Sequence, residues 1–267
     1  MMKKLTSAAI SLLFISYSNV LFAETVAPTA NSVAAPVHTE KSTHWTYRGV
    51  TGAEHWGDLS PKFSTCKTGK NQSPINIDTD ALDADLAPIK FKYNMLTADN
   101  IANTGHSIQV KMWSGGSITV DNQVFDLKQF HFHTPSENTI NGKHAPLAAH
   151  FVHQNKAGDI AVVAMLFEPG ASDRTLDTLI QFMPMNAGQT NKLNSKALKN
   201  MEGEFKSTEY FRFNGSFTTP PCTEGVRWIV MRKPMSISDR QLLAFQKALK
   251  TPNSRPVQPL NARIVAK

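Results

Sequence analysis

The chain has 267 residues, of which 41% are hydrophobic and 18% charged, a composition that suits one globular domain with a substantial core. Its formal net charge at pH 7 is +7. The lysines and arginines are scattered, and no basic stripe is paired with stacking aromatic residues, so nucleic acid is excluded as an expected partner.

The first 23 residues are predicted to be a secretory signal peptide. Two lysines precede an apolar segment, 8–20, which serines interrupt, and Ala23 is a small residue at the expected cleavage point. The segment is too short and too polar for a membrane anchor, so we expect no stable membrane insertion after cleavage, and a mature charge of +5 because two lysines are lost. Residues 24–43 lack apolar periodicity and are predicted to be a flexible leader. The folded domain is expected to span 44–267.

Within that domain, clusters of Gly, Pro, Asn and Asp separate short β-type runs. The predicted strands are 107–112, 117–120, 124–133, 148–154, 160–167 and 226–231. Two helices are predicted, 173–182 with Ser172 as its N-cap and 238–249 beginning at Ser238 and Asp239. Strands therefore dominate, and the helices are peripheral.

The strand predicted over 124–133 ends in Gln129-Phe130-His131-Phe132-His133. Because side chains alternate along a strand, His131 and His133 leave one face, and His150 can meet them from a neighbouring strand. Three neutral imidazoles favour zinc, which binds nitrogen tetrahedrally and keeps its fourth position for water when the protein supplies three ligands. An open fourth position is typical of a catalytic site. The alternative is that His150 is an ordinary half-buried histidine with no metal-binding role.

Further motifs occur in a fixed order along the chain: Asn71-Gln72-Ser73-Pro74-Ile75-Asn76-Ile77, Gly105-His106, Ser136-Glu137-Asn138, and Gly215-Ser216-Phe217-Thr218-Thr219-Pro220-Pro221-Cys222. Together with the histidines, this set resembles the alpha-class carbonic anhydrases, especially their secreted bacterial members, over about 45–264. The resemblance implies an α+β, β-dominated single domain with a large twisted, mostly antiparallel sheet, peripheral short helices and a metal site in a conical cleft. The implied reaction is reversible hydration of carbon dioxide to bicarbonate and a proton, by attack of zinc-bound hydroxide.

The resemblance also assigns roles to individual residues. His131, His133 and His150 are implied to hold one Zn²⁺ per chain. Thr218 is implied to accept the proton of the nucleophile and to pass its own hydrogen to Glu137, and His106 to carry the product proton to buffer. Residues implied to contact substrate are Val152, Val162, Phe217, Trp228, Thr218 and Thr219. Phe217 stands where leucine is commonest in the relatives, which leaves the pocket width open.

Partners for the second ring nitrogens of the ligands are implied as well. Gln129 is expected to pair with His131, and the backbone carbonyl of Asn253 with His133. For His150 the pattern breaks, because the relatives carry a glutamate where this chain has Ala148. A weakly zinc-retaining, poorly active binding protein with the same fold is therefore the alternative function.

The two cysteines, Cys66 and Cys222, are 156 positions apart. In an exported chain such a pair predicts a disulfide, whereas in a reducing cytosol two buried thiols are the default. The signal peptide favours the disulfide, and the resemblance implies that it steadies the loop carrying Thr218. We expect a secreted protein, periplasmic if its source is a Gram-negative bacterium, that handles carbon dioxide, bicarbonate and water. Secreted relatives are often dimers, so a homodimer is compatible with the resemblance.

A competing motif shares the same residues. His131-x-His133-x3-Glu137 also matches the core of a cupin metal site, in which all three bind iron or manganese. Cupins require a leading glycine, where this chain has Phe125, and a second motif block that is absent from the sequence. Loss of a zinc histidine, the usual mark of inactive carbonic-anhydrase-like proteins, does not occur here.

Overall fold

The computed structural model describes residues 43–93, 96–193, 198–199, 201, 205 and 209–267. The predicted signal peptide and all of the predicted leader except Thr43 lie outside the described residues. No helix among the described residues has both the length and the apolar content that crossing a bilayer requires.

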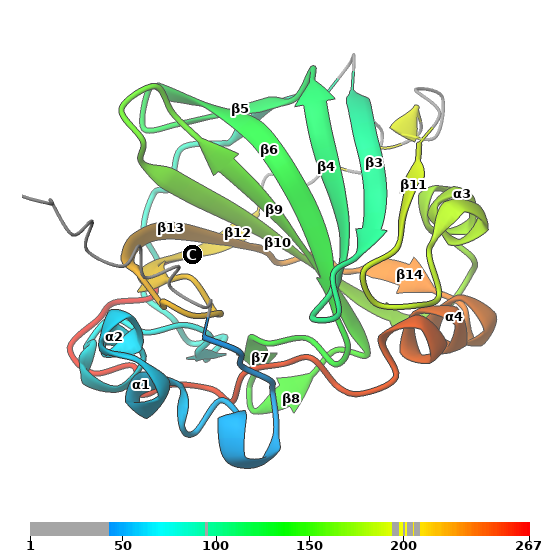
Figure 1. Cartoon of the computed structure of the whole chain (residues 1–267). Helices are drawn as coiled ribbons and strands as arrows, with labels where there is room; N and C mark the ends of the chain where they lie inside the picture. The colour runs from blue at the N-terminus through cyan, green and yellow to red at the C-terminus, as the bar shows by residue number, and fades with distance from the viewer. Residues whose placement is uncertain (1–42, 94–95, 194–197, 200, 202–204, 206–208) are drawn as a thin grey trace, which may run out of the picture. The chain divides into compact units, whose positions relative to one another are not determined.

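A mixed sheet of eleven strands dominates the described part of the chain (Figure 1), in agreement with the predicted fold class. Its main path runs β11-β3-β4-β6-β9-β10-β13-β12, while β14 pairs with β10, and β5 pairs with both β2 and β6. Most pairings are antiparallel; β10 is parallel to β13 and β14. The strands of this sheet are β2 (Lys90–Lys92), β3 (Thr97–Asn103), β4 (Ile108–Ser114), β5 (Ser117–Val120), β6 (Gln123–His133), β9 (Leu147–Gln154), β10 (Ile160–Pro169), β11 (Thr190–Lys192), β12 (Tyr210–Ser216), β13 (Glu224–Met231) and β14 (Met235–Ile237).

A second, small sheet has the order β1-β7-β8. Its strands are β1 (Asn76–Ile77), β7 (Thr139–Ile140) and β8 (Lys143–His144). The helical segments are η1 (Gly49–Thr51), α1 (Trp56–Leu59), η2 (Pro61–Phe63), α2 (Thr65–Thr68), α3 (Arg174–Phe182) and α4 (Asp239–Leu249). Helices α3 and α4 contact each other at the end of the large sheet where β11 and β14 lie (Figure 1).

The six predicted strands correspond to β4, β5, β6, β9, β10 and β13, each with ends within two residues of the prediction. The pattern missed β3 and β12 among the longer strands. In β3, register shifts near Ala98 interrupt the pairing with β4, and its Asp and Asn residues are uncommon in strands. In β12, Asn214 and Gly215 form a dipeptide typical of turns, yet here they continue the strand up to an irregularity at Ser216.

Both predicted helices form, with one correction at a cap. Helix α3 is capped by Asp173, whose carboxylate accepts from the Leu176 amide at 2.8 Å, and the predicted cap, Ser172, instead bonds the Ser238 hydroxyl at 3.0 Å. The carboxylate outcompetes the neighbouring hydroxyl as an acceptor at the positive helix terminus. Helix α4 begins as predicted, with Ser238 and Gln241 forming a capping box.

The central strands β9 and β10 are buried on both faces and supply alternate residues to two apolar clusters. Phe151 and Val163 belong to the larger cluster on one face, whereas Val152 and Val162 belong to a smaller cluster on the other. The same alternation in β6 directs Phe130 into the larger cluster. His131 and His133, which alternate with Phe130 and Phe132, are thereby turned to the opposite face of the sheet, which carries the smaller cluster and the cleft.

Candidate metal centre

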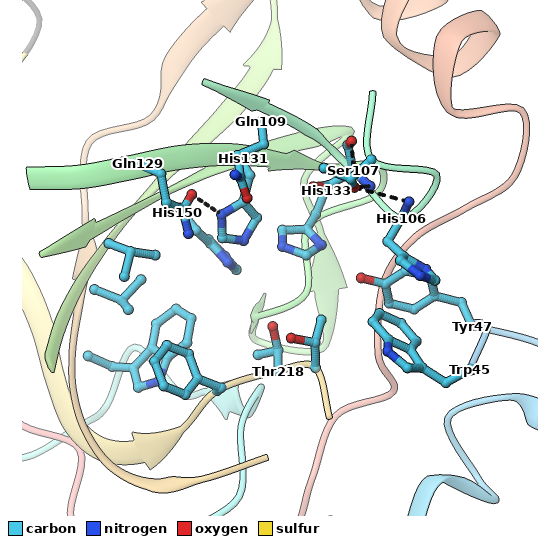
Figure 2. A pocket seen from close by; sticks show the side chains of 16 residues that line it. Trp45, Tyr47, His106, Ser107, Gln109, Gln129, His131, His133, His150 and Thr218 are labelled. Carbon is cyan, nitrogen blue, oxygen red and sulfur yellow. Dashed lines mark hydrogen bonds between the residues drawn. The ribbon is translucent and has the colours of Figure 1, made fainter. Parts of the chain in front are cut away.

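Three histidines meet on this face of the sheet. His131 and His133 lie two positions apart at the end of β6, and His150 of β9 is the cross-strand partner of His131. One ring nitrogen from each side chain lies within 4.8 Å of the others, and Figure 2 shows the three rings turned toward one another. The convergence predicted from strand alternation is therefore present.

Burial acts on the charge state of two of these rings. Burial lowers the pKa of His131 and of His150 well below the usual histidine value, and neighbouring rings of the triad lower both further. A neutral imidazole has a lone pair to give to a metal ion, so the site is ready for metal at neutral pH. Nε2 of His133 is buried without a hydrogen-bond partner among the described residues, as expected for a nitrogen reserved for a ligand.

Two of the three rings are fixed from behind. Nδ1 of His131 lies 2.8 Å from Oε1 of Gln129, and Nδ1 of His133 lies 2.8 Å from the backbone carbonyl oxygen of Asn253. Each bond leaves Nε2 to face the centre of the triad.

Glu137 lies next to the triad and is fully buried. Its Oε1 accepts from the Arg255 amide at 2.9 Å, and its Oε2 is 3.4 Å from Nε2 of His133 and 3.7 Å from Nδ1 of His150. Burial raises the pKa of this carboxyl, an effect opposed by His133, the Arg255 amide and the Thr218 hydroxyl. Thr218 is thus close enough to favour the carboxylate, although Oε2 has no hydrogen-bond partner within 3.5 Å among the described residues.

The loop that carries Thr218 is anchored by the predicted disulfide, which joins Cys66 to Cys222. The amide of Cys222 donates to the Thr219 carbonyl at 2.9 Å, closing the turn. Gln72 donates from Nε2 to the carbonyl of Cys222 at 3.1 Å. The loop is therefore held both covalently and by hydrogen bonds from a distant part of the chain.

The triad forms the floor of a cleft of about 340 Å³ (Figure 2). One wall is apolar and contains the four residues expected there, Val152, Val162, Phe217 and Trp228. The polar residues that complete the lining include Thr218 and Thr219 together with Thr104, His106, Ser107, Gln109 and Gln129. The cleft therefore offers an apolar side and a polar side to a small molecule above the triad.

Trp45 and Tyr47 also line the cleft, although no sequence pattern points to either residue beyond Trp45 marking the start of the domain. The ring of Trp45 stacks on His106 at 3.8 Å between centroids with an interplanar angle of 12°, and Tyr47 meets the same ring edge-on at 6.5 Å. Burial, and secondarily the proximity of His44, lowers the pKa of His106. His106 is thus a half-buried histidine at the cleft wall rather than a free turn residue.

The comparisons with known proteins agree with this geometry. The family model for eukaryotic-type carbonic anhydrases matches residues 51–267. A carbonic anhydrase of Pectobacterium atrosepticum is 44% identical over 225 residues, covering 84% of this chain and 91% of the relative. One of Neisseria gonorrhoeae is 45% identical over 229 residues, covering 84% and 87%. The structure of alpha-carbonic anhydrase from Thermovibrio ammonificans with the inhibitor sulfanilamide has a TM-score of 0.79 at 46% identity, covering 85% of this chain and 100% of that one.

The chain therefore belongs to the alpha-carbonic anhydrase family. It is a carbonate dehydratase that hydrates carbon dioxide reversibly, with its histidine triad in the arrangement of the family's zinc site. The residues present fit that ion, because three imidazoles converge, no thiolate competes and a buried ring nitrogen is left without another partner among the described residues. The disulfide, together with the likeness to bacterial relatives, indicates a protein that resides outside the reducing cytoplasm.

Proposed function

We propose that His131, His133 and His150 hold a single zinc ion and that the remaining residues of the cleft orient the reactants and remove the product proton. The convergence of three ring nitrogens within 4.8 Å at the floor of the cleft carries this assignment. When bound, zinc supplies a nucleophile at neutral pH by lowering the pKa of water to about 7, the known value for carbonic anhydrase.

Thr218 and Glu137 orient the nucleophile in this proposal. A hydroxyl can accept one hydrogen bond while donating another, so Thr218 can accept from the attacking oxygen and donate to the carboxylate. Glu137 is suited to the receiving role because Oε1 is already engaged by the Arg255 amide, while Oε2 has no partner among the described residues. The lone pair that attacks carbon dioxide is then directed by a fixed carboxylate rather than by bulk water.

The apolar wall receives carbon dioxide. Val152, Val162 and Trp228 are at most 8% exposed, and Phe217 packs against the same cluster. A linear molecule without net dipole loses little hydration on entering such a surface, whereas bicarbonate, which is charged, is better solvated on the opposite, polar wall. Thr219, which lines the cleft beside Thr218, is suited to contact the product.

His106 carries the proton out of the cleft. Its ring lines the same cleft as the triad and lies against Trp45 and Tyr47 (Figure 2). Because its pKa is lowered, the ring is neutral at pH 7 and able to accept a proton, then release it to buffer.

Paired histidine variants test the ligand assignment. His133→Ala leaves two imidazoles, so we expect loss of both bound zinc and carbon dioxide hydration, measured by metal analysis and stopped-flow assay. His55→Ala is the matched control, because His55 is exposed and absent from the cleft lining. Normal zinc content in His133→Ala, or equal losses in both variants, would show that the triad is not the metal site.

The cellular setting is part of the proposal. We infer export by the signal peptide 1–23, removal of that segment, a flexible leader over 24–43 and a catalytic domain over 44–267, with residence in the periplasm if the source is Gram-negative. Scattered basic residues support the absence of a nucleic-acid partner. Mass measurement of the exported protein tests the cleavage point, and light scattering tests whether the mature enzyme is a homodimer.

A further inference from the structure

The three imidazoles of the triad differ in how their second nitrogens are satisfied. Gln129 and the Asn253 carbonyl serve His131 and His133, and Figure 2 draws the Gln129 bond. His150 makes no hydrogen bond with any described residue: its Nε2 is fully buried without a partner, and its Nδ1 is 3.7 Å from Glu137, beyond hydrogen-bonding distance. One ligand of three is therefore positioned without a hydrogen bond.

The two nitrogens of His150 can be assigned from Glu137. Oε2 of that carboxylate lies 3.4 Å from Nε2 of His133, which faces the triad centre because its other nitrogen is bonded to Asn253. The same oxygen lies 3.7 Å from Nδ1 of His150, so Nδ1 faces the centre too. Nε2 is then the nitrogen that must carry the ring hydrogen whenever Nδ1 binds metal.

No side chain among the described residues accepts a hydrogen bond from Nε2 of His150. Ala148, two positions before His150 on the same face of β9, is fully buried, and Ala164 is the cross-strand neighbour of His150 on β10. Trp228 meets the ring edge-on at 5.0 Å, and its only polar atom donates to the Ser216 carbonyl. Packing alone holds the ring in place.

We propose that His150 is the weakly held ligand of the triad and that Ala148 sets the rate at which the metal leaves. Coordination through Nδ1 buries an N–H group that has no acceptor, a cost the other two ligands do not bear. In the metal-free enzyme the hydrogen can move to Nδ1, which faces the Glu137 carboxylate. Loss of the metal is therefore more favourable here than in a triad whose three ligands all have hydrogen-bond acceptors. The proposal rests on the ligand set given under Proposed function.

Three substitutions at one position separate hydrogen bonding from charge and bulk. Ala148→Glu adds an acceptor with charge, Ala148→Gln adds an acceptor without charge, and Ala148→Met adds similar length with no good acceptor. The measurement is the rate of zinc transfer from each loaded enzyme to an excess of a colorimetric chelator. We expect release to slow by roughly 10–100-fold in the Glu and Gln variants, and to stay near the native rate in the Met variant.

Equal release rates in native, Glu and Gln enzymes would overturn the proposal, since they would mean that a trapped water already accepts the hydrogen. Slowing in the Met variant to the same extent would overturn it too, because filling space would then be sufficient. Failure of the native enzyme to bind one zinc ion per chain from excess zinc would instead refute the ligand assignment itself.

A second measurement does not depend on the variants folding. In the zinc-loaded native enzyme, ring N–H protons can be observed by nuclear magnetic resonance, and hydrogen bonding moves them downfield. We expect downfield ring N–H signals from His131 and His133 and a signal from His150 clearly upfield of both. Three equally downfield signals would show that the His150 N–H has an acceptor and would overturn the proposal.

Discussion

His153 provides a test of how burial of a neutral histidine makes this enzyme sensitive to acid. The side chain is fully buried on the face of β9 opposite the triad, and its Nε2 lies 2.6 Å from the hydroxyl of Tyr93. Burial lowers its pKa from 6.5 to about 3, although the backbone at Ala161 and Phe151 opposes the shift. Between pH 6.5 and 3, His153 is therefore protonated in the unfolded chain but not in the folded protein.

The sign follows from that difference. Below pH 6.5 the unfolded chain binds more protons at this residue, so stability falls as the pH decreases from 6.5 toward 3 and is fully present above 6.5. Each pH unit inside the window costs about 1.4 kcal/mol, and near its upper edge the titration is incomplete. At pH 5 the loss attributable to His153 is about 2 kcal/mol, roughly 4–8 °C in Tm for a domain of this size.

His153→Gln removes the titration while keeping an acceptor for Tyr93. The free energy of unfolding of both disulfide-intact enzymes is measured in urea at pH 8, 7, 6 and 5. Between pH 8 and pH 5 we expect the value for the native enzyme to fall about 2 kcal/mol further than the value for the variant. Tyr93→Phe is the control, because it removes the hydrogen bond between Tyr93 and His153 but leaves the titrating histidine. Protonation of the triad and loss of metal affect the native and Gln enzymes alike. Parallel pH profiles for these two proteins would refute the reasoning.

Four further outcomes follow from the site and its supports. Thr218→Ala should keep zinc but lower the hydration rate roughly 10²-fold, with unchanged rate as the contrary result. His106→Ala should lower maximal turnover, and imidazole buffer should restore it; lack of rescue would assign the proton to another group. Reducing the Cys66–Cys222 disulfide should cost about 2–5 kcal/mol in urea unfolding, and free thiols in the exported protein would contradict the expectation. Arg255→Met should destabilise the fold by about 3–5 kcal/mol, which a thermal shift of less than 2 °C would contradict.

The sequence predicted best what depends on local alternation. The period of two places His131 and His133 on one face of β6 and Phe130 on the other, and the structure agrees because β6 keeps its register with β4 over 129–131 and with β9 over 129–133. The meeting of β6 with His150 on β9 required only that these two strands be adjacent. Motif resemblance then gave Glu137, Thr218 and His106, which spacing alone would not single out.

The two aromatic residues that line the cleft beside His106 were not predictable in the same way. Trp45 and Tyr47 lie about 60 positions before His106 and belong to no regular element, so neither periodicity nor a motif connects them to the site. Their contact with His106 follows from how the segment before α1 folds against the sheet. Trp56 extends the same cluster, meeting Trp45 at 5.0 Å.

The segment 253–255 shows how strongly the site depends on contacts between distant parts of the chain. Besides its carbonyl bond to His133, Asn253 donates to the carbonyl oxygens of Phe132 and His106, and its Oδ1 accepts from the Thr134 amide. One side chain thus links the end of the ligand strand to the backbone of the proposed proton carrier.

Arg255, two residues later, extends these links to the Thr218 loop. Its amide holds Glu137, while its fully buried guanidinium donates to Oε1 of Gln72 and to the carbonyl oxygens of Ser73 and Cys66. Burial lowers the pKa of Arg255 to about 10, which still leaves it charged at pH 7. If Glu137 orients the nucleophile as proposed, that orientation depends on the disulfide segment through a buried cation as well as through the loop itself. A structural defect introduced at either end should reach Glu137 without any change in the zinc ligands.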